Sequence, residues 1–154
     1  MNKVIIYTDG GARGNPGPAA AGVVFYLPAG RQGLPIESGG KKSNEKQEIF
    51  KEYSQYLGEN LTNNEAEYRA VIFALKRAKL LFGKKATKNL EVEIKSDSEL
   101  LVRQMEGKYK ILEPKIQKLF IKVWNLKIDF KKVKFTAIAR ERNKEADRLV
   151  NQAL

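Results

Sequence analysis

The chain of 154 residues contains no cysteine and no histidine. Without cysteine there are no disulfide bonds, no thiolate metal sites and no cysteine nucleophile. Without histidine, acid–base or metal chemistry must depend on carboxylates, lysine or tyrosine. The two absences together leave carboxylates as the main candidate ligands for any metal ion.

The sequence also lacks an apolar run long enough to span a membrane, and no secretory signal peptide is visible. We therefore expect a cytoplasmic protein without membrane contact, and we expect a monomer. With 42% hydrophobic and 31% charged residues, the composition is that of an ordinary globular protein. The length predicts a single domain over residues 1–154 with a sizeable core.

Acidic residues are outnumbered by basic ones. The chain has 18 Asp and Glu against 29 Lys and Arg, which gives a formal net charge of +11. This excess favours a polyanionic partner, and nucleic acid is the most common one. Charge also serves solubility, and composition alone does not separate the two explanations.

The most informative stretch, VIIYTDGGARGNPGP at residues 4–18, comes near the start of the chain. Its apolar run predicts a strand buried on both faces, and the run ends at Thr8 and Asp9. The glycines that follow allow a tight turn and a close approach of backbone to a ligand. Asp9 is therefore either a catalytic acid on a rigid strand end or the residue that opens a turn.

Hydrophobic periodicity predicts an α/β domain with a mixed sheet, in the order of three strands, a helix, a strand, two helices, a strand and a helix. Residues 47–57 fit an edge strand or a short helix, and their place after two strands favours a strand. An insertion at about 28–50 is interpreted as an exposed loop or an extended hairpin. The expected strands cover residues 4–7, 19–27, 47–57, 90–95 and 133–138, and the expected helices cover residues 62–82, 99–106, the segment after Pro114 and the segment from Asn143.

Glu67 lies on the apolar stripe of the first predicted helix, which Thr62 or Asn63 can cap. The other members of the stripe are Val71, Ala74, Ala78 and Leu81. A carboxylate on a buried stripe costs several kcal/mol unless it is paired or bound to a metal. Glu67 is thus a candidate functional residue. Because it lies near the helix start, a bend of its side chain toward solvent would also remove this energetic cost.

Asp97 and Asp147 are the other candidate acids. Asp97 follows the strand at 90–95. In the alternation of side chains along this strand, Asp97 falls on the polar side, which favours a helix N-cap over a metal ligand. Asp147 stacks with Asn143 and Asn151 at intervals of four residues on the last helix. Neither pattern alone requires a functional role.

If Asp9, Glu67, Asp97 and Asp147 converge, they require a cation, because four clustered anions repel one another. Hard oxygen ligands without histidine or cysteine select Mg²⁺ or Mn²⁺. Two such ions roughly 4 Å apart would clamp the attacking and leaving oxygens of a phosphodiester and activate water. The basic surface would then bind a polyanion that the acids cleave.

Four motifs in this order resemble the ribonuclease H family of type I over nearly the whole chain, apart from roughly residues 28–50. They are YTDGGARGNPGP at 7–18, TNNEAEYRA at 62–70, SDSELLVRQ at 96–104 and RNKEADRLVNQAL at 142–154. The resemblance implies the ribonuclease H-like fold, a five-stranded mixed sheet of three antiparallel and then parallel strands flanked by α-helices.

The resemblance also implies an endoribonuclease that hydrolyses the RNA strand of RNA/DNA hybrids by a two-metal-ion mechanism, with 3′-OH and 5′-phosphate products. Two Mg²⁺ ions, with Mn²⁺ as a substitute, would be the cofactors. By motif position, Asp9, Glu67, Asp97 and Asp147 are similar to the four metal-binding catalytic acids of the family. For Asp97, this favours a metal ligand over an N-cap.

Further residues enter through the same resemblance. It implies that Gly11, Asn15, Asn63 and Asn64 line the minor groove of the hybrid, where amides and backbone N–H groups can read the 2′-OH groups of RNA. Thr62 would help to seat a phosphate of the DNA strand. Asparagines in such loops are otherwise ordinary turn formers.

The chain departs from the family pattern where several members carry a histidine between the last strand and the last helix. Residues 137–142 read AIARER here. Arg140 or Glu141 would have to substitute in part, so we expect slow turnover or a preference for Mn²⁺.

The lysine-rich handle that some members insert between their central helices is also missing, because only a few residues separate Gly107 from Pro114. Substrate binding would then depend on other cations. The candidates are the row Lys115, Lys118 and Lys122, and Lys41 with Lys42 in the insertion. A lysine row is otherwise a solvated helix face.

Two other functions remain open at this point. One is a non-catalytic module that binds a hybrid or RNA, which the presence of all four acids disfavours. The other is a nuclease of the same fold that cuts double-stranded RNA or RNA–DNA junctions, which the acids alone do not distinguish from hybrid cleavage.

Overall fold

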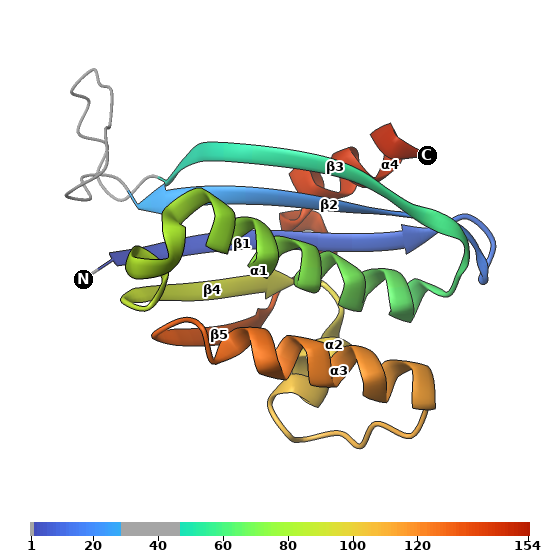
Figure 1. Ribbon diagram of the computed structural model, residues 1–154. Helices are drawn as coiled ribbons and strands as arrows, with labels where there is room; N and C mark the ends of the chain where they lie inside the picture. Colours follow the sequence, from blue (N-terminus) through green and yellow to red (C-terminus); the bar gives the residue numbers. More distant parts are fainter. Residues whose placement is uncertain (1, 29–46) are drawn as a thin grey trace.

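The computed structural model describes residues 2–28 and 47–154, and within them the chain forms one five-stranded sheet (Figure 1). The strand order is β3-β2-β1-β4-β5, with β1 at the centre. Strand β1 pairs antiparallel with β2, and β2 with β3, whereas the β1–β4 and β4–β5 pairs are parallel. The strands are β1 (Asn2–Ala12), β2 (Gly17–Pro28), β3 (Gln47–Leu61), β4 (Leu90–Ser96) and β5 (Lys132–Ala137). The predicted mixed sheet is therefore confirmed.

Helices cover both faces of the sheet. Figure 1 shows α1 in front of the central strands and α4 behind β2 and β3. The pleat explains this, because Val23 and Phe25 on β2 pack in the α1 core while Val24 packs with α4. The helices are α1 (Asn63–Thr87), α2 (Glu99–Met105), α3 (Pro114–Lys127) and α4 (Lys144–Ala153), with a short 3-10 turn at Arg140–Arg142.

Helix α1 begins where the sequence predicts, at the cap Thr62. The Thr62 hydroxyl accepts from the Glu65 N–H at 3.1 Å, and the Glu65 carboxylate accepts from the Thr62 N–H at 2.9 Å. This reciprocal capping box satisfies two backbone donors and fixes the start of the helix beside the sheet. The helical segment extends beyond the predicted end at residue 82, across a break at Gly83, where φ is +84°.

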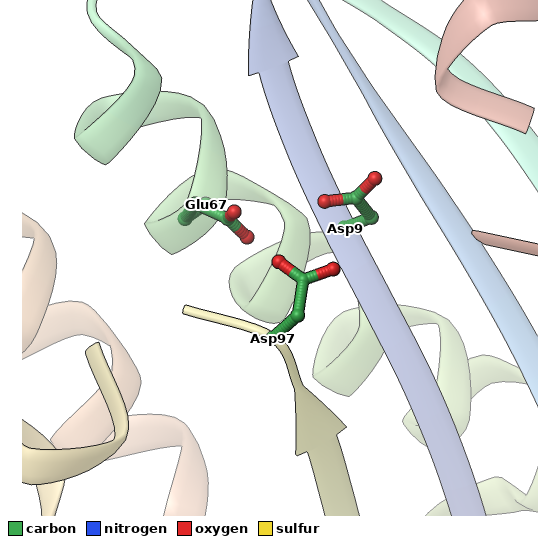
Figure 2. Close-up of side chains that lie close together, drawn as sticks. All are labelled: Asp9, Glu67 and Asp97. Atoms are coloured by element: carbon green, nitrogen blue, oxygen red, sulfur yellow. The ribbon is translucent and has the colours of Figure 1, made fainter. Parts of the chain in front are cut away.

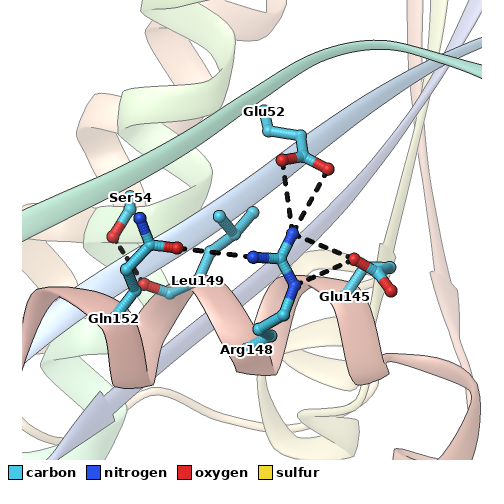
Figure 3. A network of polar contacts seen from close by, with 6 residues as sticks. All are labelled: Glu52, Ser54, Glu145, Arg148, Leu149 and Gln152. Carbon is cyan, nitrogen blue, oxygen red and sulfur yellow. Dashed lines mark hydrogen bonds and ion pairs between the residues drawn. The ribbon is translucent and has the colours of Figure 1, made fainter.

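Helix α4 is held against the sheet at several points, as Figure 3 shows. The Ser54 hydroxyl on β3 donates to the Leu149 carbonyl at 2.6 Å. Arg148 donates to both carboxylate oxygens of Glu52 at 3.3 Å and also pairs with Glu145. The backbones of Gly22 and α4 approach so closely that a Cβ at Gly22 would overlap the Ala146 carbonyl. The last helix is thereby placed across β2 and β3.

The structure corrects two sequence expectations and leaves one outside its range. Ser98, and not Asp97, caps α2 through a hydrogen bond from the Leu101 N–H at 3.2 Å. The sequence after Pro114 predicts one apolar helix stripe of Ile116, Leu119, Phe120, Val123 and Trp124; in α3 only Ile116, Leu119 and Val123 are buried and Trp124 is 47% exposed, because the buried face of this helix is narrower than the apolar pattern. Of the insertion at about 28–50, residues 47–50 belong to β3, and residues 29–46 lie outside the described part of the chain.

None of the helices in the described part of the chain is long and apolar enough to cross a membrane.

Candidate active site

Two of the predicted acids lie at the same level of two neighbouring parallel strands, Asp9 within β1 and Asp97 directly after β4. Thr8 on β1 pairs with Ser96 on β4, and Asp9 and Asp97 directly follow them. Ligand sites in sheets of this kind gather beyond the carboxyl ends of the strands. The parallel register therefore brings the two carboxylates to the same level of the sheet.

Glu67 joins them from α1. The Gly10 N–H donates to Glu67 Oε1 at 3.2 Å, and the helix backbone lies directly against Gly10. One carboxylate oxygen from each of Asp9, Glu67 and Asp97 lies within 4.8 Å of the others. Figure 2 shows the three side chains pointing toward one another. Residues that are far apart in the sequence thus form one acidic cluster.

Asp147 is not part of this tight group. It is exposed on α4 and lines the same cleft of about 350 Å³ together with Asp9, Glu67 and Arg140. Asn151, one turn further along α4, donates to Asp147 at 3.5 Å. The structure therefore brings three of the four predicted acids together and places the fourth beside them in the cleft.

The carboxyl groups of Asp9 and Glu67 are held in an environment that disfavours their negative charge. Burial, the charges of Asp97 and Asp147 and a hydrogen bond with Asp147 raise the pKa of Asp9 to about 8, against a partial opposing effect of Arg140. Burial, followed by the charges of Asp9 and Asp97, raises the pKa of Glu67 well above its usual range. Such crowded carboxylates fit a divalent cation that prefers oxygen ligands, because the cation replaces the protons and removes the repulsion.

Asn143, which the sequence analysis assigned only to the start of the last helix, also reaches this site. Its amide nitrogen donates to the Thr8 carbonyl at 2.9 Å and to Asp97 Oδ2 at 3.0 Å. The polar row that Asn143 forms with Asp147 and Asn151 was the available sequence signal. The contact with Asp97 depends on tertiary structure, and the row alone does not predict it.

The predicted substrate-binding residues lie on or just after β1 and at the start of α1, and several of them have structural partners. Asn63 Oδ1 accepts from the Ala12 N–H at 2.9 Å, and the Asn63 N–H donates to Asn15 Oδ1 at 2.9 Å. Gly11 and Asn63 line the acidic cleft. Thr62 instead lines a neighbouring depression with Pro114 and Lys115, and Asn64 is half-buried in the first turn of α1.

The two candidates for the place of the absent histidine lie on different sides of the 3-10 turn. Arg140 lines the acidic cleft, and its positive charge lowers the pKa of both Asp9 and Glu67. Glu141 lines a separate depression beside Tyr7 and Tyr26. The geometry therefore favours Arg140.

A mixed five-stranded sheet with one carboxylate on its central strand β1, a second directly after the parallel strand β4, a third on α1 and a fourth on the last helix defines a ribonuclease H-like domain. The family described as reverse transcriptase-like matches residues 7–153. The structure of LC11-RNase H1 in complex with an RNA/DNA hybrid is 44% identical, with a TM-score of 0.78 over 97% of this chain and 95% of that one. The chain belongs to the ribonuclease H family, type I.

Curated relatives agree with this assignment. Ribonuclease HI of Halobacterium salinarum is 33% identical over 99% of this chain, and a bifunctional protein of Mycobacterium tuberculosis is 34% identical over the same share. The chain spans 64% of the length of the first and 35% of the length of the second.

Proposed function

We propose that this protein is a metal-dependent endoribonuclease that hydrolyses the RNA strand of RNA/DNA hybrids and leaves 3′-OH and 5′-phosphate ends. The observation that carries the proposal is the cluster of Asp9, Glu67 and Asp97, whose carboxylate oxygens lie within 4.8 Å of one another. Asp147 shares their cleft. Three clustered carboxylates, of which Asp9 is buried and Glu67 and Asp97 are half-buried, are costly without a cation, and the net charge of +11 suits a polyanionic substrate.

Asp9, Glu67, Asp97 and Asp147 would hold two Mg²⁺ ions, with Mn²⁺ as a substitute. When bound, these ions would supply Lewis-acid stabilisation of the phosphodiester and an activated water. The protein contributes the fixed positions of the ligands: Gly10 orients Glu67, and the β1–β4 register aligns Asp9 with Asp97. Asp9 must give up the proton that its raised pKa retains in the metal-free state.

Recognition of the hybrid is proposed for the residues around this cleft. Gly11, Asn15, Asn63 and Asn64 would face the minor groove. There the amide nitrogen of Asn63 would donate to a 2′-OH group, since its amide oxygen accepts from the Ala12 N–H. Thr62 would seat a phosphate of the DNA strand in the depression that it shares with Lys115. Such contacts would distinguish an RNA strand from a DNA strand.

The proposal is tested by cleavage of a labelled RNA/DNA hybrid beside RNA-duplex, DNA-duplex and RNA–DNA junction controls. Each substrate is incubated with Mg²⁺, Mn²⁺ or EDTA, with the wild type and with Asp9→Asn. We expect metal-dependent cutting of the hybrid RNA strand that is lost in Asp9→Asn. Tight hybrid binding without cleavage under either metal would instead identify a binding module, and preferential cutting of duplex RNA or junctions would identify a different nuclease.

A further inference from the structure

Asn143 is a buried polar residue that contacts the elements carrying three of the four acids. Only 1% of its surface is exposed. Its amide nitrogen donates to the carbonyl of Thr8, the residue before Asp9, and to Asp97 Oδ2. Its own carbonyl accepts the Asp147 N–H at 3.1 Å, at the start of α4.

The orientation of this amide is determined by chemistry. Both partners of the nitrogen are acceptors, so only the NH₂ end of the side chain can occupy this place. The other end, Asn143 Oδ1, is buried and has no partner among residues 2–28 and 47–154. The fold therefore keeps a carbonyl oxygen unsatisfied while the two donations to Thr8 and Asp97 are made.

The bond to Asp97 restricts how that carboxylate can turn. Within the described part of the chain, Asn143 is the only side chain that donates a hydrogen bond to Asp97. Hydrogen bonds of this kind orient ligating carboxylates, and their loss typically weakens metal affinity by about 10- to 100-fold.

We propose that Asn143 is a positioning residue of the metal site: it fixes the orientation of the Asp97 carboxylate and at the same time secures the start of α4, which carries Asp147. The inference rests on the metal site of the proposed function. It assigns Asn143 no contact with the substrate and no part in proton transfer.

If Asn143 only attached α4 to the sheet, its loss would have the same effect as the loss of any other attachment of α4. Ser54 and Arg148 also attach α4 to β3 (Figure 3), and among the hydrogen bonds of residues 2–28 and 47–154 neither contacts any of the four acids. Loss of these attachments should lower stability without changing the orientation of Asp97. Ser54→Ala and Arg148→Ala are therefore matched controls.

The experiment measures Mn²⁺ binding by isothermal titration calorimetry for the wild type, Asn143→Ala, Ser54→Ala and Arg148→Ala, with folding checked by circular dichroism in EDTA. We expect Asn143→Ala to bind Mn²⁺ about 10- to 100-fold more weakly while both controls bind like the wild type. Wild-type affinity in Asn143→Ala, or an equal loss in the controls, would overturn the inference. Absence of Mn²⁺ binding by the folded wild type would overturn the metal site itself.

Two further variants secure the result. If Asn143→Ala does not fold, Asn143→Ser keeps a small hydrogen-bond donor and should show a weaker loss in the same direction. In an Asp97→Asn background, Asn143→Ala should weaken the remaining Mn²⁺ affinity by much less than in the wild type, because the two residues act through one contact. Additive losses would show that Asn143 does not act through Asp97.

Discussion

Gly10 packs directly against the backbone of α1 at Ala66: a Cβ at position 10 would overlap the Ala66 carbonyl and crowd the Glu67 nitrogen. The same glycine donates its N–H to Glu67 Oε1. The position that carries this hydrogen bond is therefore also the one that sets the distance between β1 and α1. The acidic cluster depends on this close approach, because Asp9 and Glu67 lie on the two elements concerned.

Gly10→Ala should therefore push α1 away from β1. We expect a loss of about 1–3 kcal/mol of unfolding free energy from overpacking, with weaker Mn²⁺ binding. Gly11→Ala is the control for stability, because its Cβ would meet only Val150 Cγ1 at an ordinary 3.5 Å. Urea denaturation of both variants in EDTA measures the difference, and equal midpoints would contradict the packing argument.

The metal-free protein should lose stability as the pH rises. The pKa of Asp9 is raised from 3.8 to about 8, so between these values the folded state binds more protons than the unfolded state. Stability from this group is greatest below the unfolded pKa and is lost progressively up to the folded one. Asp9→Asn removes the effect and should be more stable than the wild type at pH 8, by on the order of a few kcal/mol.

This comparison is made by thermal unfolding in EDTA from pH 5 to pH 9. The advantage of Asp9→Asn should shrink toward pH 5, and Mg²⁺ should raise the melting temperature of the wild type more than that of the variant. A constant difference across this range would show that Asp9 ionises normally.

Arg140→Ala should lower kcat, because Arg140 lines the acidic cleft and its charge lowers the pKa of both Asp9 and Glu67. Glu141→Ala should have a much smaller effect, since Glu141 faces the separate depression near Tyr7. Steady-state cleavage of a hybrid with Mg²⁺ and with Mn²⁺ measures both variants.

We expect slow wild-type turnover in Mg²⁺. A Mg²⁺ rate equal to that of a histidine-containing relative would contradict the idea that the absent histidine limits the reaction.

The lysine row of α3 should contribute to substrate binding. Lys115, Lys118 and Lys122 are exposed and form no ion pair among residues 2–28 and 47–154. Their joint replacement by alanine should raise KM and reduce the slope of log affinity against log salt by up to about 3, one unit for each phosphate contact.

A matched control for this variant is available at the other end of the molecule. Lys84, Lys85 and Lys88 are also exposed, and they lie at the end of α1 opposite to Glu67. Their replacement removes the same charge and should leave the salt slope nearer to that of the wild type. Equal effects of the two triple variants would show that the lysines of α3 act only through the overall positive charge of the protein and do not contact the substrate.

Local patterns predict the parts of the site that local structure creates. The apolar run at residues 4–7 predicts β1, and Thr62 or Asn63 before the apolar stripe predicts the α1 cap, so Asp9 and Glu67 stand out as acids in unusual places. Pairing with β2 extends β1 to Ala12, so Asp9 lies within the strand and does not open a turn. Without the family resemblance, the sequence predicts Asp97 as a helix N-cap, because the alternation of side chains along the strand puts it on the polar side. In the structure β4 ends at Ser96 and Ser98 is the N-cap of α2. The Asp97 carboxylate therefore does not cap the helix and lies in the acidic cluster.

Contacts between distant segments have no such local signal. The donation from Asn143 to Asp97 depends on α4 crossing the sheet, and the tight packing at Gly10 depends on the path of α1. Glycine at position 10 is equally compatible with a simple turn in the sequence. These relationships become visible only when the elements are placed in space.

The central position of β1 has a consequence for how the chain folds. Its antiparallel neighbour β2 follows almost immediately, but its parallel neighbour β4 begins only at Leu90. The apolar edge around Val4 and Ile6 therefore stays unpaired on one side until β4 has been synthesised and docked. Such non-local pairing slows folding and leaves intermediates prone to aggregation. A nascent chain that is arrested before β4 should thus bind chaperones. A chain that is long enough to expose β4 up to residue 96 should bind them less.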